Sequence, residues 1–163
     1  MFGKLKNLFS SSGIAVAAPV SGTVVPLSEV PDPTFAQAIL GPGAAVQRGE
    51  VRIVAPANGT VDMMFDTGHA VSMTTAEGAE LLIHVGIDTV NLKGEHYTAK
   101  CKSGDTVRKG DTLIEFDLDA IKAAGYEVVT PIIVCNPDVF ASVKTEGAGG
   151  IQAGDTLLTL EKK

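Results

Sequence analysis

Two short phrases, each written twice, constrain the fold of this 163-residue chain more than any other feature. The first is Ala18–Val24 (APVSGTV), which returns as Ala55–Val61 (APANGTV). The second is Val107–Leu113 (VRKGDTL), which returns as Ile151–Leu157 (IQAGDTL), and 46–51 is a weaker copy of it. Each phrase joins strand-forming residues to a glycine turn, and the copies are too unevenly spaced for a solenoid. They predict one closed β-structure with duplicated hairpins.

The rest of the sequence favours strands over helices. Apolar residues make up 45% of the chain and charged residues 20%, which excludes general disorder, and the length suits one domain. Short runs rich in Val, Ile and Thr predict strands at 14–18, 22–27, 51–55, 59–65, 69–74, 80–86, 97–101, 112–117, 127–134 and 155–160. Helix signals are confined to 117–125, 35–40 and 137–143. We therefore expect an all-β protein, an antiparallel sandwich or barrel with a few short helices at its edges.

The N-terminus is expected to be separate from the body. The serines and glycine of 10–13 predict a linker, so that 1–13 form a tail and 14–163 the domain. Apolar side chains in 2–9 share one helical face opposite Lys4 and Lys6, which is typical of a segment that lies on an anionic membrane surface. A flexible tail is the alternative. The stretch 7–14 is too polar for a signal peptide, and no run of about 18 apolar residues predicts a membrane span.

Charge and cysteine content exclude several classes of function. The net charge is −6 and no basic stripe is present, so nucleic-acid binding is not expected. Cys101 and Cys135 are too few and too far apart for a disulfide scaffold or a CxxC metal site. They predict two reduced thiols in the cytosol, and a single bridge between them is the alternative.

His84 is the first candidate for chemistry. In the strand 80–86 and its continuation, Leu81, Ile83, Val85 and Ile87 form one apolar face, which must point into the core. His84 therefore lies on the other face, reachable but partly dehydrated. Dehydration favours the neutral imidazole, which keeps a nitrogen lone pair free as a nucleophile. A surface histidine without a role is the alternative.

His69 is the second candidate, because the spacing to His84 suits neighbouring antiparallel strands. The Thr67 hydroxyl can then fix a tautomer of His69, whereas His96 lies in a polar stretch and is expected to be solvated. Two histidines alone make an incomplete zinc site, even with Asp66 and Asp88 nearby. The sequence contains no HExxH, Walker A or GxGxxG motif.

The stretch Gly78–Val90 (GAELLIHVGIDTV) resembles the phosphohistidine signature of the glucose-class IIA component of the bacterial phosphoenolpyruvate-dependent sugar phosphotransferase system. The resemblance extends over the body, including Phe65-x-Thr67-x-His69. It implies an antiparallel β-sandwich with two adjacent histidines in a shallow apolar depression. It implies phosphorylation of His84 at Nε2, with Nδ1 held by the carbonyl of Gly86, and a hydrogen bond from His69, oriented by Thr67, to the phosphoryl oxygens. The implied partner surface comprises Phe35, Phe65, Leu82, Val90, Asp32 and Asp88.

The resemblance also implies partners and a location. The donor would be the phosphocarrier HPr, and the acceptor a cysteine on the IIB domain of a sugar permease, so that the chain would be a cytoplasmic phosphotransferase component. The tail is similar to membrane-docking tails of some family members, which would place the chain at the inner face of the membrane. Regulatory targets are further partners that the family suggests. Transfer needs no cofactor, and a regulatory zinc ion at His69 and His84 is an option that the family leaves open.

Three other readings stay open at this point. A swinging-arm carrier would need a lysine in Met-Lys-Met or Asp-Lys-Ala at a hairpin tip, and neither tripeptide occurs. A zinc peptidase of the lysostaphin type would need a His-x-His pair, which is also missing. A purely regulatory binding protein of the same fold would keep its partners after loss of His84.

Overall fold

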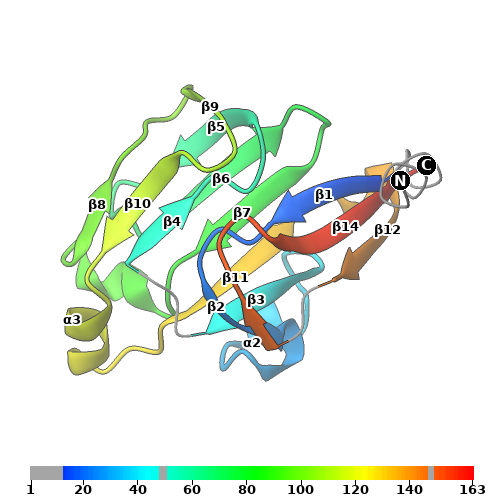
Figure 1. Ribbon diagram of the computed structural model, residues 1–163. Coiled ribbons are helices and arrows are strands. Elements are labelled where there is room, and N and C mark those ends of the chain that lie inside the picture. The colour runs from blue at the N-terminus through cyan, green and yellow to red at the C-terminus, as the bar shows by residue number, and fades with distance from the viewer. Residues whose placement is uncertain (1–12, 48–50, 147–148) are drawn as a thin grey trace.

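Figure 1 shows three antiparallel sheets, in a computed structural model that describes residues 13–47, 51–146 and 149–163. The large sheet has the strand order β13 (Gly149–Ile151), β2 (Gly22–Pro26), β3 (Gly43–Gln47), β11 (Val129–Val134), β7 (Glu80–His84), β6 (Ala70–Thr75), β5 (Gly59–Met64) and β9 (Thr106–Val107). One small sheet has the order β4 (Arg52–Val54), β10 (Thr112–Phe116) and β8 (Tyr97–Ala99). The other has the order β1 (Gly13–Ala17), β14 (Thr156–Lys162) and β12 (Phe140–Thr145). Helices α2 (Pro33–Ala36) and α3 (Leu118–Ala123) and the 3-10 turns η1 (Leu27–Glu29), η2 (Thr89–Leu92) and η3 (Pro137–Val139) connect the strands.

The main core lies between the large sheet and the two small sheets. It is aliphatic, and all three sheets contribute side chains that are completely buried, among them Val16, Leu158, Ile53, Leu113, Ile83 and Ile132. Burial of this apolar surface is the main stabilising contribution, at roughly 25 cal/mol per Å². The arrangement confirms the predicted antiparallel β-sandwich.

The duplicated phrases pack against each other at the centre of the sandwich. The N–H of Ala17 donates to the carbonyl of Pro56 (3.0 Å), and the N–H of Val54 donates to the carbonyl of Pro19 (2.8 Å). The contacts are reciprocal, because the residue that precedes each Ala-Pro phrase donates a hydrogen bond to the proline carbonyl of the other phrase. The repeat in the sequence is therefore a repeat in the hydrogen bonding.

Each Gly-Asp turn closes onto one copy of the Ala-Pro phrase. Ala18 N–H donates to the carbonyl of Asp155 (2.7 Å), and Ala55 N–H donates to that of Asp111 (2.8 Å). Gly154 and Gly110 have φ values of 97° and 95°, which glycine adopts at no steric cost. A third turn of this kind is centred on Gly104 (φ 93°) and was not predicted.

The outer face of the large sheet carries a second, smaller apolar cluster. Leu27, Val30 and Phe35 come from the η1–α2 segment, and the strands supply Ala45, Val129 and Ile133, with Ile87 from the loop after β7. Asp32 starts α2 by accepting a hydrogen bond from Thr34 N–H (2.9 Å). Because this cluster covers β11 from outside while the main core covers it from inside, every residue of β11 is buried. The cluster fixes Phe35 over the sheet.

Several predicted elements differ from the structure. The helix predicted over 137–143 is wrong, since only Pro137–Val139 forms a 3-10 turn and the chain then continues as β12 against β14. The helix expected at 35–40 lies earlier, at Pro33–Ala36. Strands β3, β9 and β13 were not predicted, although the helix over 117–125 is confirmed as α3.

Other sequence predictions fall outside the described residues. The amphipathic segment and nearly all of the 1–13 tail are among them, and so is half of the weak repeat at 46–51. None of the helices in the described ranges has the length and apolar character needed to cross a bilayer. Cys101 is buried and Cys135 is exposed, and both are free thiols.

The close approach of β3 and β11 gives a test of the packing. A Cβ on Gly43 would lie 1.9 Å from the carbonyl oxygen of Ile132, so that a side chain here must push the two strands apart. We expect Gly43→Ala to lower the free energy of unfolding by about 2–3 kcal/mol, the usual cost of overpacking. Urea denaturation followed by circular dichroism measures it.

Gly150→Ala is the matched control for this substitution. Its Cβ meets no described atom within 4 Å, and we expect a change within about 0.5 kcal/mol. Equal losses in the two variants would contradict the assignment of a tight contact to Gly43.

Candidate active site: a pair of imidazoles on the outer face of the large sheet

His84 is the last residue of β7, a strand whose side chains alternate between the core and the outer face. Leu81 and Ile83 are 1% and 0% exposed, whereas Leu82 and His84 are half-buried on the opposite face. The alternation agrees with the prediction from the sequence. His84 is therefore reachable from solvent while its strand is anchored in the core.

The turn after β7 holds the ring of His84. Gly86 has a φ of 88°, and its carbonyl oxygen lies 2.7 Å from Nδ1 of His84. A carbonyl only accepts, so Nδ1 donates its proton and Nε2 keeps the lone pair. The N–H groups of Gly86 and Ile87 both donate at 3.0 Å, to the carbonyls of Val129 and Glu127. The turn, and with it the tautomer of His84, is thus tied to β11 and the loop before it.

His69 lies beside His84 because β6 and β7 are paired. Ala70 is directly opposite His84 in the register, and Val85 N–H donates to the carbonyl of His69 at 2.7 Å. The two rings are 4.9 Å apart between centroids with an interplanar angle of 77°, an edge-to-face arrangement. A hydrogen bond joins Thr67 Oγ1 to His69 Nδ1. Thr67, His69, His84 and Gly86 thus form one connected cluster.

Two phenylalanines border the imidazole pair. Phe35 of α2 lies 5.2 Å from the ring of His84, and Phe65 lies 5.5 Å from the ring of His69, between centroids. Phe65 is half-buried, but Phe35 is only 4% exposed because the outer cluster encloses it. Phe35 therefore forms a wall of the site in the free chain, with little surface left for another protein to cover.

Both histidines favour the neutral form. Burial, with the neighbouring His84 second, lowers the pKa of His69 to about 4. Burial also lowers the pKa of His84, against the opposing effects of the Gly86 hydrogen bond and the Asp32 and Asp88 carboxylates. At neutral pH the site therefore presents two uncharged rings, and Nε2 of His84 carries a free lone pair.

The remaining residues of the predicted surface surround the site to different extents. Leu82 and Asp32 are half-buried, and Asp88 is exposed. Val90, in η2, is 51% exposed. Ile39 and Leu40 follow α2 and are 65% and 40% exposed, and sequence reasoning missed them. Two adjacent apolar residues just before the Gly41–Gly43 bend were the available signal.

The site gives no third protein ligand for a metal. Within residues 13–47, 51–146 and 149–163, no group of three or more His, Cys, Asp or Glu side chains is placed to hold an ion. His69 and His84 alone offer two of the four ligands that zinc usually takes. The geometry suits a nucleophilic imidazole with a neighbouring donor.

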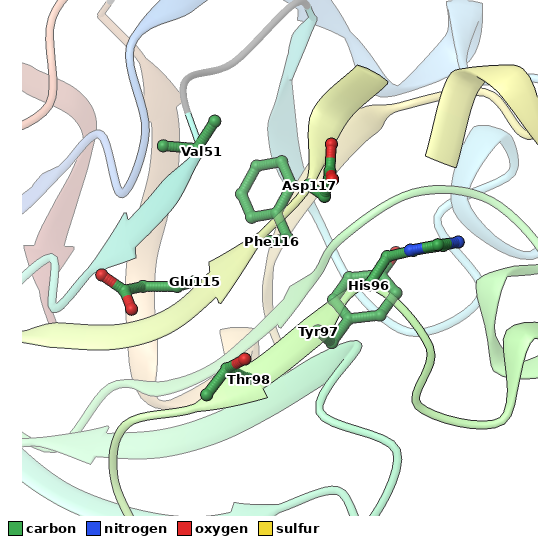
Figure 2. A pocket seen from close by; sticks show the side chains of 7 residues that line it. All are labelled: Val51, His96, Tyr97, Thr98, Glu115, Phe116 and Asp117. Carbon is green, nitrogen blue, oxygen red and sulfur yellow. The ribbon is translucent and has the colours of Figure 1, made fainter. Parts of the chain in front are cut away.

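A hollow of about 450 Å³ lies beside strands β8 and β10, and neither site histidine lines it. Figure 2 shows Tyr97 of β8 and Phe116 of β10 among its lining side chains, with His96 next to Tyr97. His96 is exposed, as predicted. We place the functional site at the imidazole pair, because the tautomer, the burial and the neighbouring donor converge there.

Comparisons with known proteins agree with this assignment. A family model for the phosphoenolpyruvate-dependent sugar phosphotransferase system, EIIA 1, matches residues 14–140. The chain is 45% identical over 147 residues to the PTS system glucose-specific EIIA component of Halalkalibacterium halodurans. This aligned region covers 90% of this chain and 85% of that protein. It is 44% identical over 145 residues to the PTS system beta-glucoside-specific EIIBCA component of Bacillus subtilis, covering 89% of this chain and 24% of that protein. The solved glucose permease IIA from Mycoplasma capricolum has a TM-score of 0.81 and 31% identity, covering 90% of this chain and 95% of that one.

The fold and the site define an antiparallel β-sandwich domain with a pair of neutral imidazoles on the outer face of its large sheet. The chain belongs to the EIIA 1 family of the phosphoenolpyruvate-dependent sugar phosphotransferase system. It is a phosphotransferase component, and its role lies in phosphoryl transfer during sugar uptake. The resemblance found in the sequence is confirmed, and membership decides against the swinging-arm and zinc-peptidase readings.

The low pKa of His69 predicts a pH-dependent stability. In the unfolded chain this group titrates near 6.5, whereas in the folded chain it stays neutral down to about 4. Between these values only the unfolded state binds the proton, so stability is complete above pH 6.5 and falls as the pH drops towards 4. We expect wild type to lose about 3 kcal/mol more unfolding free energy over this range than His69→Asn.

Urea denaturation at a series of pH values measures this difference. His96→Asn is the control for loss of an exposed histidine outside the site. Parallel pH curves for wild type and His69→Asn would contradict the neutral, buried state of His69.

Proposed function

We propose that this chain accepts a phosphoryl group from HPr on Nε2 of His84 and passes it to a cysteine of a IIB domain. The observation that carries the proposal is the hydrogen bond from His84 Nδ1 to the carbonyl of Gly86 (2.7 Å). This bond selects the tautomer whose Nε2 lone pair is free. A neutral imidazole in a partly dehydrated depression is a competent nucleophile for phosphorus.

The first step forms one bond and breaks one bond. The Nε2 lone pair of His84 attacks phosphorus in line, the bond between the donor and phosphorus breaks, and the electron pair returns to the donor. The imidazole then carries a positive charge that the Gly86 carbonyl stabilises through Nδ1–H. Such transfer depends on positioning and charge stabilisation more than on a strong base.

The second step reverses the roles at His84. The thiolate of the IIB cysteine attacks phosphorus, the P–N bond breaks, and Nε2 recovers its lone pair. His69 assists both steps: with Nδ1 accepting from the Thr67 hydroxyl, its Nε2–H donates to a phosphoryl oxygen. No metal takes part in either step.

The proposed partner surface consists of exposed and half-buried residues that surround the site. Leu82, Val90 and Phe65 supply apolar area, and Asp32 and Asp88 supply negative charge for basic side chains of HPr and IIB. Phe35 supports this surface from behind. We further propose that residues 14–163 form the carrier domain in the cytoplasm and that the 1–13 tail contacts the inner face of the membrane.

Intact mass spectrometry tests the carrier function directly. The chain is incubated with phosphoenolpyruvate, enzyme I and HPr. We expect one acid-labile phosphoryl group on wild type and none on His84→Ala, because the accepting nitrogen is gone. His96→Ala, which removes an exposed histidine outside the site, is the matched control and is expected to label fully.

The result that overturns the proposal is an unlabelled wild-type chain in a mixture that labels a known IIA protein. That outcome would favour the purely regulatory reading. Labelling of His84→Ala at the wild-type level would instead show that another residue accepts the phosphoryl group.

Two valines of equal exposure test the partner surface. Val90 and Val139 are 51% and 53% exposed, but Val139 lies in η3, beyond the opposite end of β7 from His84. We expect Val90→Asn to raise the KM for phospho-HPr about threefold to tenfold with kcat unchanged, because an apolar contact with the partner is lost. Val139→Asn should leave the KM unchanged. Equal effects of the two substitutions on the KM would contradict a contact between HPr and Val90.

A further inference from the structure

The peptide between Val85 and Gly86 is hydrogen-bonded at both ends, by side chains as well as by backbone. Val85 is completely buried, and its carbonyl oxygen accepts two side-chain hydroxyls, from Thr89 and from Tyr97, each at 2.7 Å. The other end of the same peptide is also bound, since Gly86 N–H donates to the carbonyl of Val129. This peptide lies between His84 and the peptide whose carbonyl fixes the His84 tautomer, so its orientation, together with the bond from Ile87 N–H to the carbonyl of Glu127, determines where the Gly86 carbonyl points.

Tyr97 contacts both backbone segments that carry the imidazoles. A Cβ on Gly68 would lie 3.2 Å from Cβ of Tyr97, so the base of the tyrosine packs on the residue between Thr67 and His69. Its hydroxyl reaches Val85, which follows His84 and whose N–H donates to the carbonyl of His69. One side chain, from strand β8 of a different sheet, thus links the His69 segment to the His84 segment.

The ring of Tyr97 is itself supported from behind. Phe116 of β10 packs against it at 6.4 Å between centroids, and Figure 2 shows both rings side by side on neighbouring strands. Burial raises the pKa of Tyr97 to about 12, so the hydroxyl keeps its proton and remains a donor throughout the physiological range. The hydroxyl of Tyr97 is thus supported by its own ring packing and keeps the proton that it donates to Val85.

We propose that Tyr97 is a positioning residue for phosphoryl transfer: through Val85 it fixes the Gly86 carbonyl against His84 Nδ1 and sets the distance between the two imidazoles. The inference rests on the proposed function of His84. In the described part of the chain, the hydrogen bond and the ring pairing of Tyr97 go to Val85 and Phe116 and not to either imidazole. Its loss therefore changes the rate of transfer within the complex and leaves partner affinity as it was.

The test removes one hydroxyl. Tyr97→Phe keeps the ring, its packing on Gly68 and its contact with Phe116. We expect kcat for transfer from phospho-HPr to fall about tenfold with KM unchanged, because small displacements of reacting groups are costly in rate. The Nδ1–H proton of His84, followed by NMR, should exchange with water several-fold faster in this variant.

Matched variants separate positioning from a general loss of stability. Tyr126→Phe removes the hydroxyl of the other tyrosine, which is not one of the two side-chain donors to the Val85 carbonyl, and should leave kcat at the wild-type value. Thr89→Val removes the second donor to the same carbonyl. Combined with Tyr97→Phe it should lower kcat by more than the product of the two single effects, because the buried carbonyl then loses both donors. All rates are measured at a temperature where circular dichroism shows each variant fully folded.

A wild-type kcat in Tyr97→Phe overturns the inference, and so does an equal loss of kcat in Tyr126→Phe. A reduced kcat without faster exchange of the His84 proton overturns it as well, because the effect would then act elsewhere. Phosphorylation of wild type in the same mixture distinguishes these results from a failure of the carrier proposal. If wild type is not labelled, the exchange rate of the His84 proton in Tyr97→Phe still tests the positioning.

Discussion

The left-handed turn at Gly86 is the constraint on which the site depends. At a φ of 88°, a Cβ would lie 2.5 Å from Cγ2 of Thr89, so only glycine fits without displacing its neighbours. The turn directs a main-chain carbonyl back at the side chain two residues earlier. A short backbone bend thereby decides which nitrogen of His84 carries the proton, and hence which one can act as a nucleophile.

The sandwich supplies the rigidity that this turn needs. Reciprocal bonds between the two Ala-Pro phrases join the two small sheets to each other, and bonds to the Gly-Asp turns extend the strand pairing within each of them. The large sheet is then covered on both faces at β11, by the main core inside and by the α2 cluster outside. His84 lies at the border of the outer cluster, where the sheet is firm but its surface is still open. A firm and open surface suits the brief contacts with successive protein partners that the proposed function requires.

The predictions succeeded where the information is local. Alternation placed His84 on the outer face, Gly-Asp steps marked the turns, and an aspartate and a glycine bounded α3. The predictions failed for elements that form only by pairing with segments far away in the sequence. Gly43–Gln47 is built mostly from small residues that show little strand preference, and it is a central strand because β2 and β11 pair with it. The run 137–143 fits a short helix by pattern, but β14 offers it an open edge.

The sequence by itself determined the β class, the duplicated hairpins, the family and the residue types at the site. These features follow from periodicity, turn residues and motifs that are read over a few positions. Only the tertiary structure decided that Phe35 is enclosed beside His84, that Ile39 and Leu40 are exposed after α2, and that the Tyr97 hydroxyl joins Thr89 on the carbonyl of Val85. These contacts join segments far apart in the chain, and their geometry depends on how whole sheets pack, which no local pattern contains.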